Sequence, residues 1–183
     1  NCPITLNTTP PNIFDVVSGI IDVAILCGNG EWSGVQVEKL FALELEPVVS
    51  AEFLKSTPLD HPEQLANTQL LHSTARPDDW ADWVADVGAH SLSPGGGIMF
   101  EGSALAFEAA VHGVGAAMGQ RALLATELAS GRLVAPFGKP FNDGTAFYLV
   151  YSKKLADDRR IKSFRKWLLA EATEFSEHSQ YSA

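Results

Sequence analysis

Apolar and polar residues change their spacing several times along the chain, and these changes predict alternating strands and helices. Residues 4–7 (ITLN) alternate, as in a short strand. Residues 22–27 (DVAILC) are almost continuously apolar, as in a parallel strand covered on both faces. Asn12 is placed to cap an intervening helix with Asp15 in its first turn. The helix then shows one apolar stripe, formed by Ile13, Val16, Val17 and Ile20.

The same alternation continues to the end of the chain. Residues 35–50 predict one or two extended strands, and Pro47 interrupts them, which suits an exposed crossing segment. Two short helices are expected between residues 50 and 68. Further strands are predicted at 69–73, 97–101, 114–119, 132–137 and 145–152. Further helices are predicted at 77–88, 103–113, 121–131 and 157–175. This order indicates open α/β sheets.

Three of these helices carry distinct packing or end signals. The helix 77–88 should end at Gly88, and the helix 103–113 should be capped by Ser103 and end at Gly113. The first is expected to place Trp80, Trp83, Val84 and Val87 on one side. The last helix of the chain is expected to direct inward Ile161, Phe164, Trp167 and Leu168.

Composition and charge narrow the class of protein. The 183 residues suffice for one sizeable domain or two small lobes. A chain with a net charge of −9 repels the negative phosphate backbone of DNA, so this segment alone is not expected to bind DNA. No stretch approaches the ~20 apolar residues of a membrane span, and no signal-peptide pattern opens the chain, so we expect a cytoplasmic location and no membrane partner. Cys2 and Cys27 are expected to be buried free thiols.

Familiar chemical motifs are weak. Residues 28–34 (GNGEWSG) and 113–119 (GVGAAMG) resemble a dinucleotide fingerprint, but the third glycine comes one residue late and the strand–turn–helix context is missing. His72 has no neighbour at metal-ligand spacing, and we favour a strand-end imidazole that bonds a loop. Glu101 is either a catalytic acid or, as we favour, a surface or hinge carboxylate. We therefore expect no cofactor and no metal.

Small polar residues follow three of the predicted strands. Thr8 and Thr9 follow the first, Ser73 and Thr74 follow residues 69–72, and Gly102 and Ser103 follow residues 97–101. In open α/β sheets, ligands bind outside such strand ends and against helix amino termini. Each serine can also be a simple helix cap. Without a partner to activate a nucleophile, the pattern favours a small-ligand crevice over a catalytic centre.

A longer run of residues is more specific than these motifs. Residues 18–41 (SGIIDVAILCGNGEWSGVQVEKLF) resemble the G-x-x-D-x-A-I-R-x-G-x-G-x-W-x-G run of LysR-type transcriptional regulators, closest to the glycine-cleavage-activator and β-lactamase-regulator subgroup. The resemblance continues, in order, through segments 47–54, 70–84, 100–119, 128–137, 147–154 and 164–172.

The resemblance implies an α/β, two-lobed fold like that of periplasmic binding proteins, with two crossing strands and an effector between the lobes. Lobe one would comprise residues 1–45 and 152–183, and lobe two residues 46–151. The crossings would be residues 43–49 and 147–151. The first strand and helix of lobe one, and the winged helix-turn-helix domain, would be absent from this chain.

The resemblance also implies which residues contact the effector. We expect these contacts from Thr8, Thr9, Ser73, Phe100, Gly102, Ser103 and Phe147. Relatives often carry tyrosine at the position of Phe147, so one hydroxyl is lost here. Relatives often carry arginine near the position of Cys27.

The sequence therefore predicts the effector-binding and oligomerisation region of a bacterial regulator that senses a small polar metabolite and catalyses nothing. The expected partners are a small-molecule effector, a second copy of the chain in a homodimer or homotetramer, and DNA only through the absent domain. One alternative is a solute-binding protein of a transport system with the same bilobal fold. Another is a small α/β hydrolase or transferase that uses Ser103.

Overall fold

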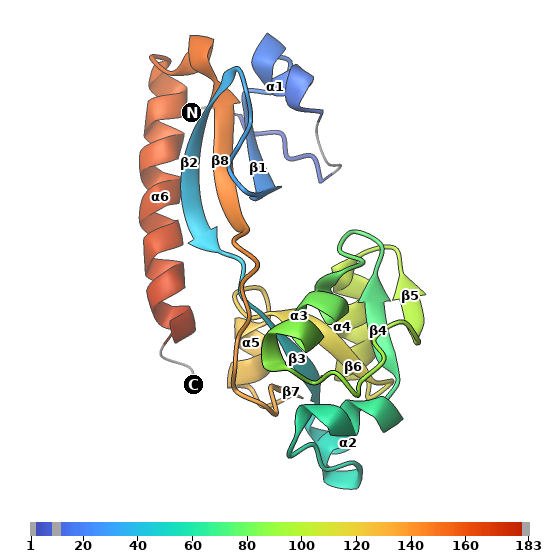
Figure 1. Ribbon diagram of the computed structural model, residues 1–183. Helices are drawn as coiled ribbons and strands as arrows, with labels where there is room; N and C mark the ends of the chain where they lie inside the picture. Colours follow the sequence, from blue (N-terminus) through green and yellow to red (C-terminus); the bar gives the residue numbers. More distant parts are fainter. Residues whose placement is uncertain (1–2, 9–11, 181–183) are drawn as a thin grey trace. The chain divides into compact units, whose positions relative to one another are not determined.

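The computed structural model describes residues 3–8 and 12–180 (Figure 1). The chain forms two compact units. Unit 1 contains the described residues of Asn1–Leu43 together with Gly144–His178, and Glu44–Asp143 forms the body of unit 2. The chain passes from unit 1 to unit 2 after Leu43 and returns to unit 1 after Asp143.

Unit 1 is built on a three-stranded sheet with the order β1-β8-β2. Strand β8 (Ala146–Ser152) lies in the centre and pairs antiparallel with β1 (Val23–Gly28) and β2 (Val35–Ala42). The register pairs Val23 with Tyr151 in β1 and Val35 with Ser152 in β2. The sheet thus joins strands from both ends of the chain.

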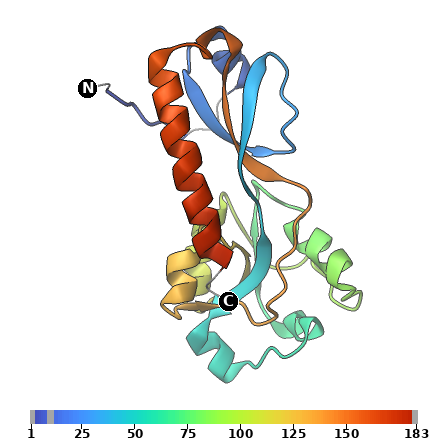
Figure 2. The ribbon, with the colours of Figure 1, turned by 90° about the vertical axis from the view of Figure 1, so that its left-hand side faces the viewer.

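The two faces of this sheet pack on different helices. Val150 and Ala24 pack with Val16 of helix α1 (Ile13–Ser18). Leu149 and Tyr151 instead pack with Ile161 of helix α6 (Arg159–Gln180). The short 3₁₀ helix η2 (Lys153–Leu155) joins β8 to α6, which runs alongside the sheet (Figure 2). Alternate residues of β8 face opposite helices because successive strand side chains point to opposite faces.

Two strand predictions in unit 1 are wrong. Strand β1 is antiparallel to β8 and, in the described part of the chain, pairs with no other strand, so it lies at an edge of the sheet. Ile25 is consequently 53% exposed, and Cys27 is exposed and not the buried thiol expected. Residues 4–7 form no strand and are exposed, because no described strand pairs with them. Cys2 lies outside the described residues.

The helix predictions in unit 1 hold in part. The Asn12 side chain accepts a hydrogen bond from the Phe14 N–H at 3.0 Å, as expected of a helix cap. Gly19 then ends α1 in the left-handed conformation (φ 84°), which leaves Ile20 beyond the helix and exposed. In α6, Trp167 is 54% exposed and does not face inward as predicted. It lies six residues after the buried Ile161, which puts it far around the helix.

Unit 2 contains a five-stranded sheet with the order β5-β4-β6-β3-β7. The strands are β3 (Leu45–Ser50), β4 (Leu70–Ser73), β5 (Ile98–Phe100), β6 (Ala116–Gln120) and β7 (Leu133–Val134). Strand β4 pairs parallel with β5 and β6, whereas β3 pairs antiparallel with β6 and β7. The parallel part agrees with the predicted open α/β sheet.

The helices of unit 2 cover this sheet. They are α2 (Ala51–Ser56), the 3₁₀ helix η1 (Pro62–Asn67), α3 (Asp79–Val87), α4 (Ser103–Val111) and α5 (Ala125–Ala129). Phe107 and Ala110 of α4 pack on Val48, Leu71 and Ala117 of the sheet. Trp80 and Trp83 of α3 are buried as predicted, and Gly88 ends α3 in the left-handed conformation.

Pro47 has a different setting from the one expected. It lies within β3 and is buried, whereas the sequence suggested an exposed crossing segment. Leu45 exchanges backbone hydrogen bonds with Phe141 on one side of β3, and Val49 pairs with Val134 of β7 on that side. Pro47 lies between these two contacts, so its missing N–H falls where the ladder is interrupted.

The boundaries of the compact units differ from the predicted lobe boundaries. Strand β8 belongs to unit 1 because it is the centre of the unit 1 sheet, so residues 147–151 lie inside that unit. The chain leaves unit 2 earlier, between Asp143 and Gly144. The functional lobes stay a prediction: lobe one is residues 1–45 with 152–183, and lobe two is residues 46–151.

Candidate functional site

The ends of β4 and β5 meet the start of α4 in unit 2. Thr74, the first residue after β4, donates its N–H to the Phe100 carbonyl at 2.9 Å. Its hydroxyl donates to the Glu101 carbonyl at 2.7 Å. Since Ser103 begins α4 two residues after Glu101, these bonds bring the small polar residues of two strand ends to one edge of the sheet.

A tight turn after β4 fixes Ser73 and Arg76 side by side. The Arg76 N–H donates to the Ser73 carbonyl at 3.1 Å, and the two residues form an isolated antiparallel bridge. The Ser73 hydroxyl oxygen accepts from the Ala75 N–H at 3.2 Å. The turn therefore holds the base of the Arg76 side chain beside a buried strand-end hydroxyl.

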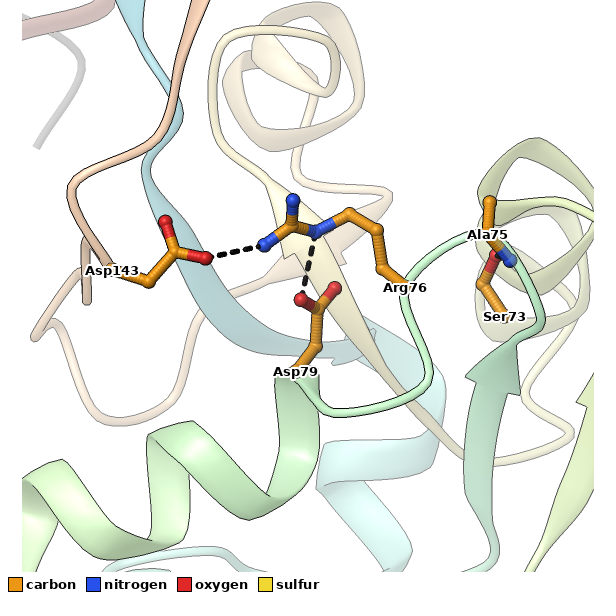
Figure 3. Close-up of polar contacts among 5 residues, drawn as sticks. All are labelled: Ser73, Ala75, Arg76, Asp79 and Asp143. Atoms are coloured by element: carbon orange, nitrogen blue, oxygen red, sulfur yellow. Dashed lines mark hydrogen bonds and ion pairs between the residues drawn. The ribbon is translucent and has the colours of Figure 1, made fainter. Parts of the chain in front are cut away.

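Arg76 binds two carboxylates at once (Figure 3). Its Nε donates to Asp79 Oδ1 at 2.7 Å, and its Nη2 donates to Asp143 Oδ2 at 2.9 Å. Asp79 lies in the first turn of α3, and Asp143 is the last residue of the unit 2 body before Gly144. The side chains of Arg76, Asp79 and Asp143 are 18%, 10% and 23% exposed, so the three charges are only partly in water.

Burial and charge shift the titration of this cluster. Burial raises the pKa of Asp79 from 3.8 to about 6, and the charges of Asp143 and Asp82 add to this, against the attraction of Arg76. For Arg76, burial lowers the pKa. The charges and hydrogen bonds of the two carboxylates outweigh this effect, so the pKa of Arg76 is raised. One guanidinium thus neutralises only one of two neighbouring carboxylates.

Ser103 opens α4 but is not its cap. Gly102 is the N-cap, and Ser103 is the first helical residue, because Gly102 adopts the extended conformation (φ −149°, ψ 158°). The predicted cap is therefore wrong by one residue. The half-buried Ser103 hydroxyl makes no hydrogen bond within the described part of the chain. It is free to bind a ligand without disrupting a cap.

A small pocket in unit 2 joins these groups. Its polar lining includes His72, Ser73, Arg76, Asp79 and Ser103. Its apolar lining consists of Leu71, Trp80, Ala106, Phe107 and Met118. A few polar groups on a mostly apolar wall are typical of a small-molecule site.

His72 has the structural role that the sequence favoured. Its Nε2 lies 2.9 Å from the Gly96 carbonyl, so the imidazole bonds the loop before β5. It makes no hydrogen bond to Ser103 in the described residues, although both line the pocket. This arrangement gives Ser103 no base and does not favour a serine nucleophile. Glu101 is exposed, in keeping with a surface carboxylate.

The predicted contact residues fall in different parts of the chain. Phe100 packs against the unit 2 core, and Gly102 is half-buried, with open space where a Cβ would lie. Thr8 and Phe147 belong to unit 1, where Thr8 is exposed and Phe147 packs on Phe41 with ring centroids 5.0 Å apart. Thr9 lies outside the described residues. Ser73 and Ser103 are the predicted residues that line the unit 2 pocket.

Sequence reasoning missed three charged residues of the site. They are Arg76, Asp79 and Asp143. The sequence carries a signal for Arg76 and Asp79: an arginine lies in the turn that follows a strand-end serine, and an aspartate comes three residues after the arginine. Asp143 is 67 positions from Arg76, so its role depends on the tertiary fold.

In residues 3–8 and 12–180, no three histidine, cysteine or carboxylate side chains come together as metal ligands would. No helix in this part of the chain combines the length and apolar character that a membrane crossing needs.

The fold and the pocket define a class: a two-lobed α/β ligand-binding domain of the periplasmic-binding-protein type. The family model described as LysR substrate binding domain matches residues 4–173. The chain belongs to this family.

Individual relatives agree with this assignment. The chain is 39% identical over 159 residues to the glycine cleavage system transcriptional activator of Escherichia coli (strain K12), a match that covers 86% of this chain and 52% of that protein. It is 31% identical over 161 residues to the transcriptional activator AmpR of Citrobacter koseri, covering 88% and 54%. The chain thus spans about half the length of the curated relatives it matches.

Solved structures show the same fold. The effector domain of AmpR from Pseudomonas aeruginosa matches with a TM-score of 0.78 and 28% identity, covering 91% of this chain and 79% of that chain. The AmpR effector binding domain from Citrobacter freundii matches with a TM-score of 0.76 and 25% identity, covering 87% and 78%. These relatives are transcriptional regulators, so the alternative of a transport solute-binding protein is not supported.

Proposed function

We propose that this chain is the effector-binding and oligomerisation region of a LysR-type transcriptional regulator that senses a small polar metabolite. A winged helix-turn-helix in the remainder of the regulator would bind DNA, and effector binding would control that activity. One observation carries the proposal: in a chain of the LysR substrate-binding family, Ser73, Arg76 and Ser103 line one pocket at the strand ends of unit 2.

The pocket suits a small ligand that carries an anionic or strongly polar group. The Ser103 hydroxyl is uncommitted and half-buried, and Arg76 supplies the cation. Phe100 and Gly102 extend the unit 2 side of the proposed contact set, because they lie within the three residues before Ser103. Thr8, Thr9 and Phe147 are retained as proposed contacts from unit 1, as the family resemblance implies.

The proposed function is binding without catalysis or a cofactor. Ser103 lacks a hydrogen-bonded base among the described residues, which supports this reading. The relatives named as transcriptional activators support it too. A regulator that acts on DNA in bacteria would be cytoplasmic, with DNA reached only through the remainder of the regulator and no membrane partner.

Self-association is the second part of the proposal. The default closed arrangement of identical subunits is a twofold dimer, from which a tetramer can be built. Phe14 and Ile20, next to the buried Val16 of α1, expose apolar surface that a second copy can cover. Light scattering of the complete regulator should show a dimer or tetramer at tens of micromolar (roughly the range where ~8 kcal/mol interfaces hold), and a monomer would contradict this part.

Effector identity provides the main test. Mass spectrometry of small molecules released from the purified complete regulator should identify a polar metabolite. Calorimetry should then show that this metabolite binds with one site per chain and changes the affinity of the regulator for its DNA. A metabolite that binds without changing DNA affinity would leave a binding protein but contradict the regulatory proposal.

A further inference from the structure

Asp79 places a carboxylate in the lining of the unit 2 pocket with one of its oxygens unused. Its side chain is only 10% exposed. Asp79 Oδ1 accepts a hydrogen bond from Arg76 Nε at 2.7 Å, whereas Oδ2 accepts none in the part of the chain that the structure describes. In Figure 3, Oδ2 lies on the side of the carboxylate that is away from Asp143. Since a largely buried carboxylate oxygen needs a donor, a ligand that enters the pocket can supply one.

The charge around Asp79 favours a cationic ligand group over an anionic one. Arg76 lines the pocket, but it already binds both Asp79 and Asp143. Burial, together with the negative charges of Asp143 and Asp82, raises the pKa of Asp79 to about 6 despite the attraction of Arg76. The ionised Asp79 is therefore short of positive charge, and a cation bound at Oδ2 would supply it.

The size of the pocket limits which cation can enter it. The pocket has a volume of about 10 Å³, which is room for one water-sized group. A protonated amine presents a single nitrogen of this size with up to three N–H donors, whereas a carboxylate presents three heavy atoms. Ser103 adds a half-buried hydroxyl that makes no hydrogen bond within the described residues. The pocket thus matches an amine head group whose remaining atoms lie outside it.

We propose that Asp79 Oδ2 binds a protonated amino group of the effector and that the Ser103 hydroxyl is a second acceptor for the same group. Arg76 is a positioning residue, because its hydrogen bond to Oδ1 fixes the carboxylate and leaves Oδ2 free. The inference rests on the proposed function, since it places the effector in the unit 2 pocket. It deepens that function by naming the chemical class of the effector: a small metabolite with a primary amine.

A proton and an amine would compete for Asp79. Protonation removes the charge that binds the amine, so amine binding should weaken as the pH falls through about 6. The charges of Arg76, Asp143 and Asp82 also act on Asp79, and His72 lines the same pocket. Asp79→Asn removes the competing carboxylate and keeps these four residues, so the pH step belongs to Asp79 where the variant lacks it.

The test titrates methylammonium into the complete regulator and follows binding by saturation-transfer NMR observed on the probe. Asp79→Asn should raise the methylammonium dissociation constant roughly tenfold or more, because the charge is lost while the side-chain shape is kept. Between about pH 7 and about pH 5, methylammonium binding should weaken in the parent but not in Asp79→Asn. Tetramethylammonium carries the same charge but is larger and has no N–H donor, so it should not distinguish the two proteins.

Controls separate this site from a general charge effect. Asp86→Asn removes the same charge from an exposed position of α3 and should leave methylammonium binding unchanged. Ser103→Ala keeps Asp79 and its ion pair and should also weaken methylammonium binding, so the site is tested by a second variant. Thermal unfolding of each variant shows whether it is folded.

The outcomes distinguish the inference from the function on which it rests. If the parent and Asp79→Asn bind methylammonium equally, or if tetramethylammonium loses affinity to the same extent, the amine site is wrong. The neutral polar probe acetamide then tests the pocket itself: weaker acetamide binding in Ser103→Ala would leave the proposed function in place. If neither methylammonium nor acetamide responds to Ser103→Ala or Asp79→Asn, the effector site is not in this pocket and both proposals fail.

Discussion

Arg121 donates a hydrogen bond from Nε to Glu46 Oε1 at 2.7 Å, and the Glu46 side chain is only 1% exposed. Glu46 is the second residue of β3, close to Glu44, where the chain enters unit 2. Its second oxygen, Oε2, is buried and makes no hydrogen bond in the described part of the chain. The charge of Glu46 thus depends on a single partner inside unit 2.

Removal of that partner should strongly destabilise the protein. Arg121→Met leaves a buried carboxylate without compensation, which costs about 3–5 kcal/mol of the free energy of unfolding. The double change Arg121→Met with Glu46→Leu should recover most of this loss, because no buried charge then remains. Urea unfolding of the parent and variants measures both effects.

An exposed ion pair gives the control for this prediction. Arg132 pairs with Glu127 at 2.7 Å, but its side chain is largely in water. Arg132→Met should therefore cost at most about 1 kcal/mol. Equal losses for Arg121→Met and Arg132→Met would show that burial of Glu46 is not what makes its partner important.

Ser103→Ala should weaken effector binding without destabilising α4. A hydrogen bond to a charged ligand group contributes ~1.5–3 kcal/mol, so affinity should fall roughly tenfold to a hundredfold. The melting temperature should hardly change, because Gly102 is the N-cap and no cap bond is lost. Calorimetry and thermal unfolding provide the two measurements.

Ser56→Ala is the matched control for the loss of a hydroxyl. Ser56 is exposed and donates only to the Phe53 carbonyl, within its own short helix. It should bind the effector as the parent does. A large drop in melting temperature for Ser103→Ala would show that the hydroxyl has a structural role after all.

Protonation of Asp79 should make the folded protein more stable as the pH falls through about 6. Its folded-state pKa is raised from 3.8 to about 6, so the folded protein binds the proton more tightly than the unfolded chain. Stability is therefore gained between about pH 7 and about pH 4, and the ionised form costs up to about 3 kcal/mol above that range. Other carboxylates titrate in the same region, so the difference between two proteins is the useful quantity.

That difference comes from Asp79→Asn, which has no proton to bind. The free energy of unfolding of the parent, relative to Asp79→Asn, should increase as the pH is lowered from about 7 to about 4. Urea unfolding at several pH values measures it. A constant difference, or one that decreases toward acid, would contradict the raised pKa of Asp79.

Gly97 should not tolerate a side chain. A Cβ there would lie 2.1 Å from the Leu70 carbonyl oxygen, and the backbone has φ 138°, a conformation that other residues rarely adopt. Gly97→Ala should lower the free energy of unfolding by more than the ~1–3 kcal/mol of backbone strain alone, because the close approach of β4 and the loop before β5 is also lost. Gly95→Ala is the control, since nothing lies within 4 Å of its added Cβ.

Much of the local structure was predictable from the sequence. Asn12 and Gly88 define helix ends through side-chain capping and left-handed glycine, which depend on a few neighbouring residues. Ser73 was recognised as a strand-end hydroxyl beside a turn, and it lines the pocket. His72 was expected to bond a loop, and it bonds Gly96. The family-specific run at residues 18–41 identified the fold correctly.

The errors arose where the outcome depends on which strands become neighbours. The pattern of β1 shows its apolar character, but only the structure shows that it pairs antiparallel with β8, so that Ile25 and Cys27 are exposed. Residues 4–7 have a strand-like alternation, yet alternation cannot supply a pairing partner. Trp167 shares the apolar character of α6 but lies off its buried stripe.

The sequence by itself therefore determined most of the elements, the helix ends at Asn12 and Gly88, the family and two hydroxyls of the pocket, because these follow from local spacing and residue type. The tertiary structure decided the strand order, the one-residue shift that makes Gly102 and not Ser103 the N-cap of α4, and the contact between Arg76 and Asp143. That contact joins residues 67 positions apart. Contacts of this kind depend on how the whole of unit 2 packs, so no local pattern in the sequence predicts them.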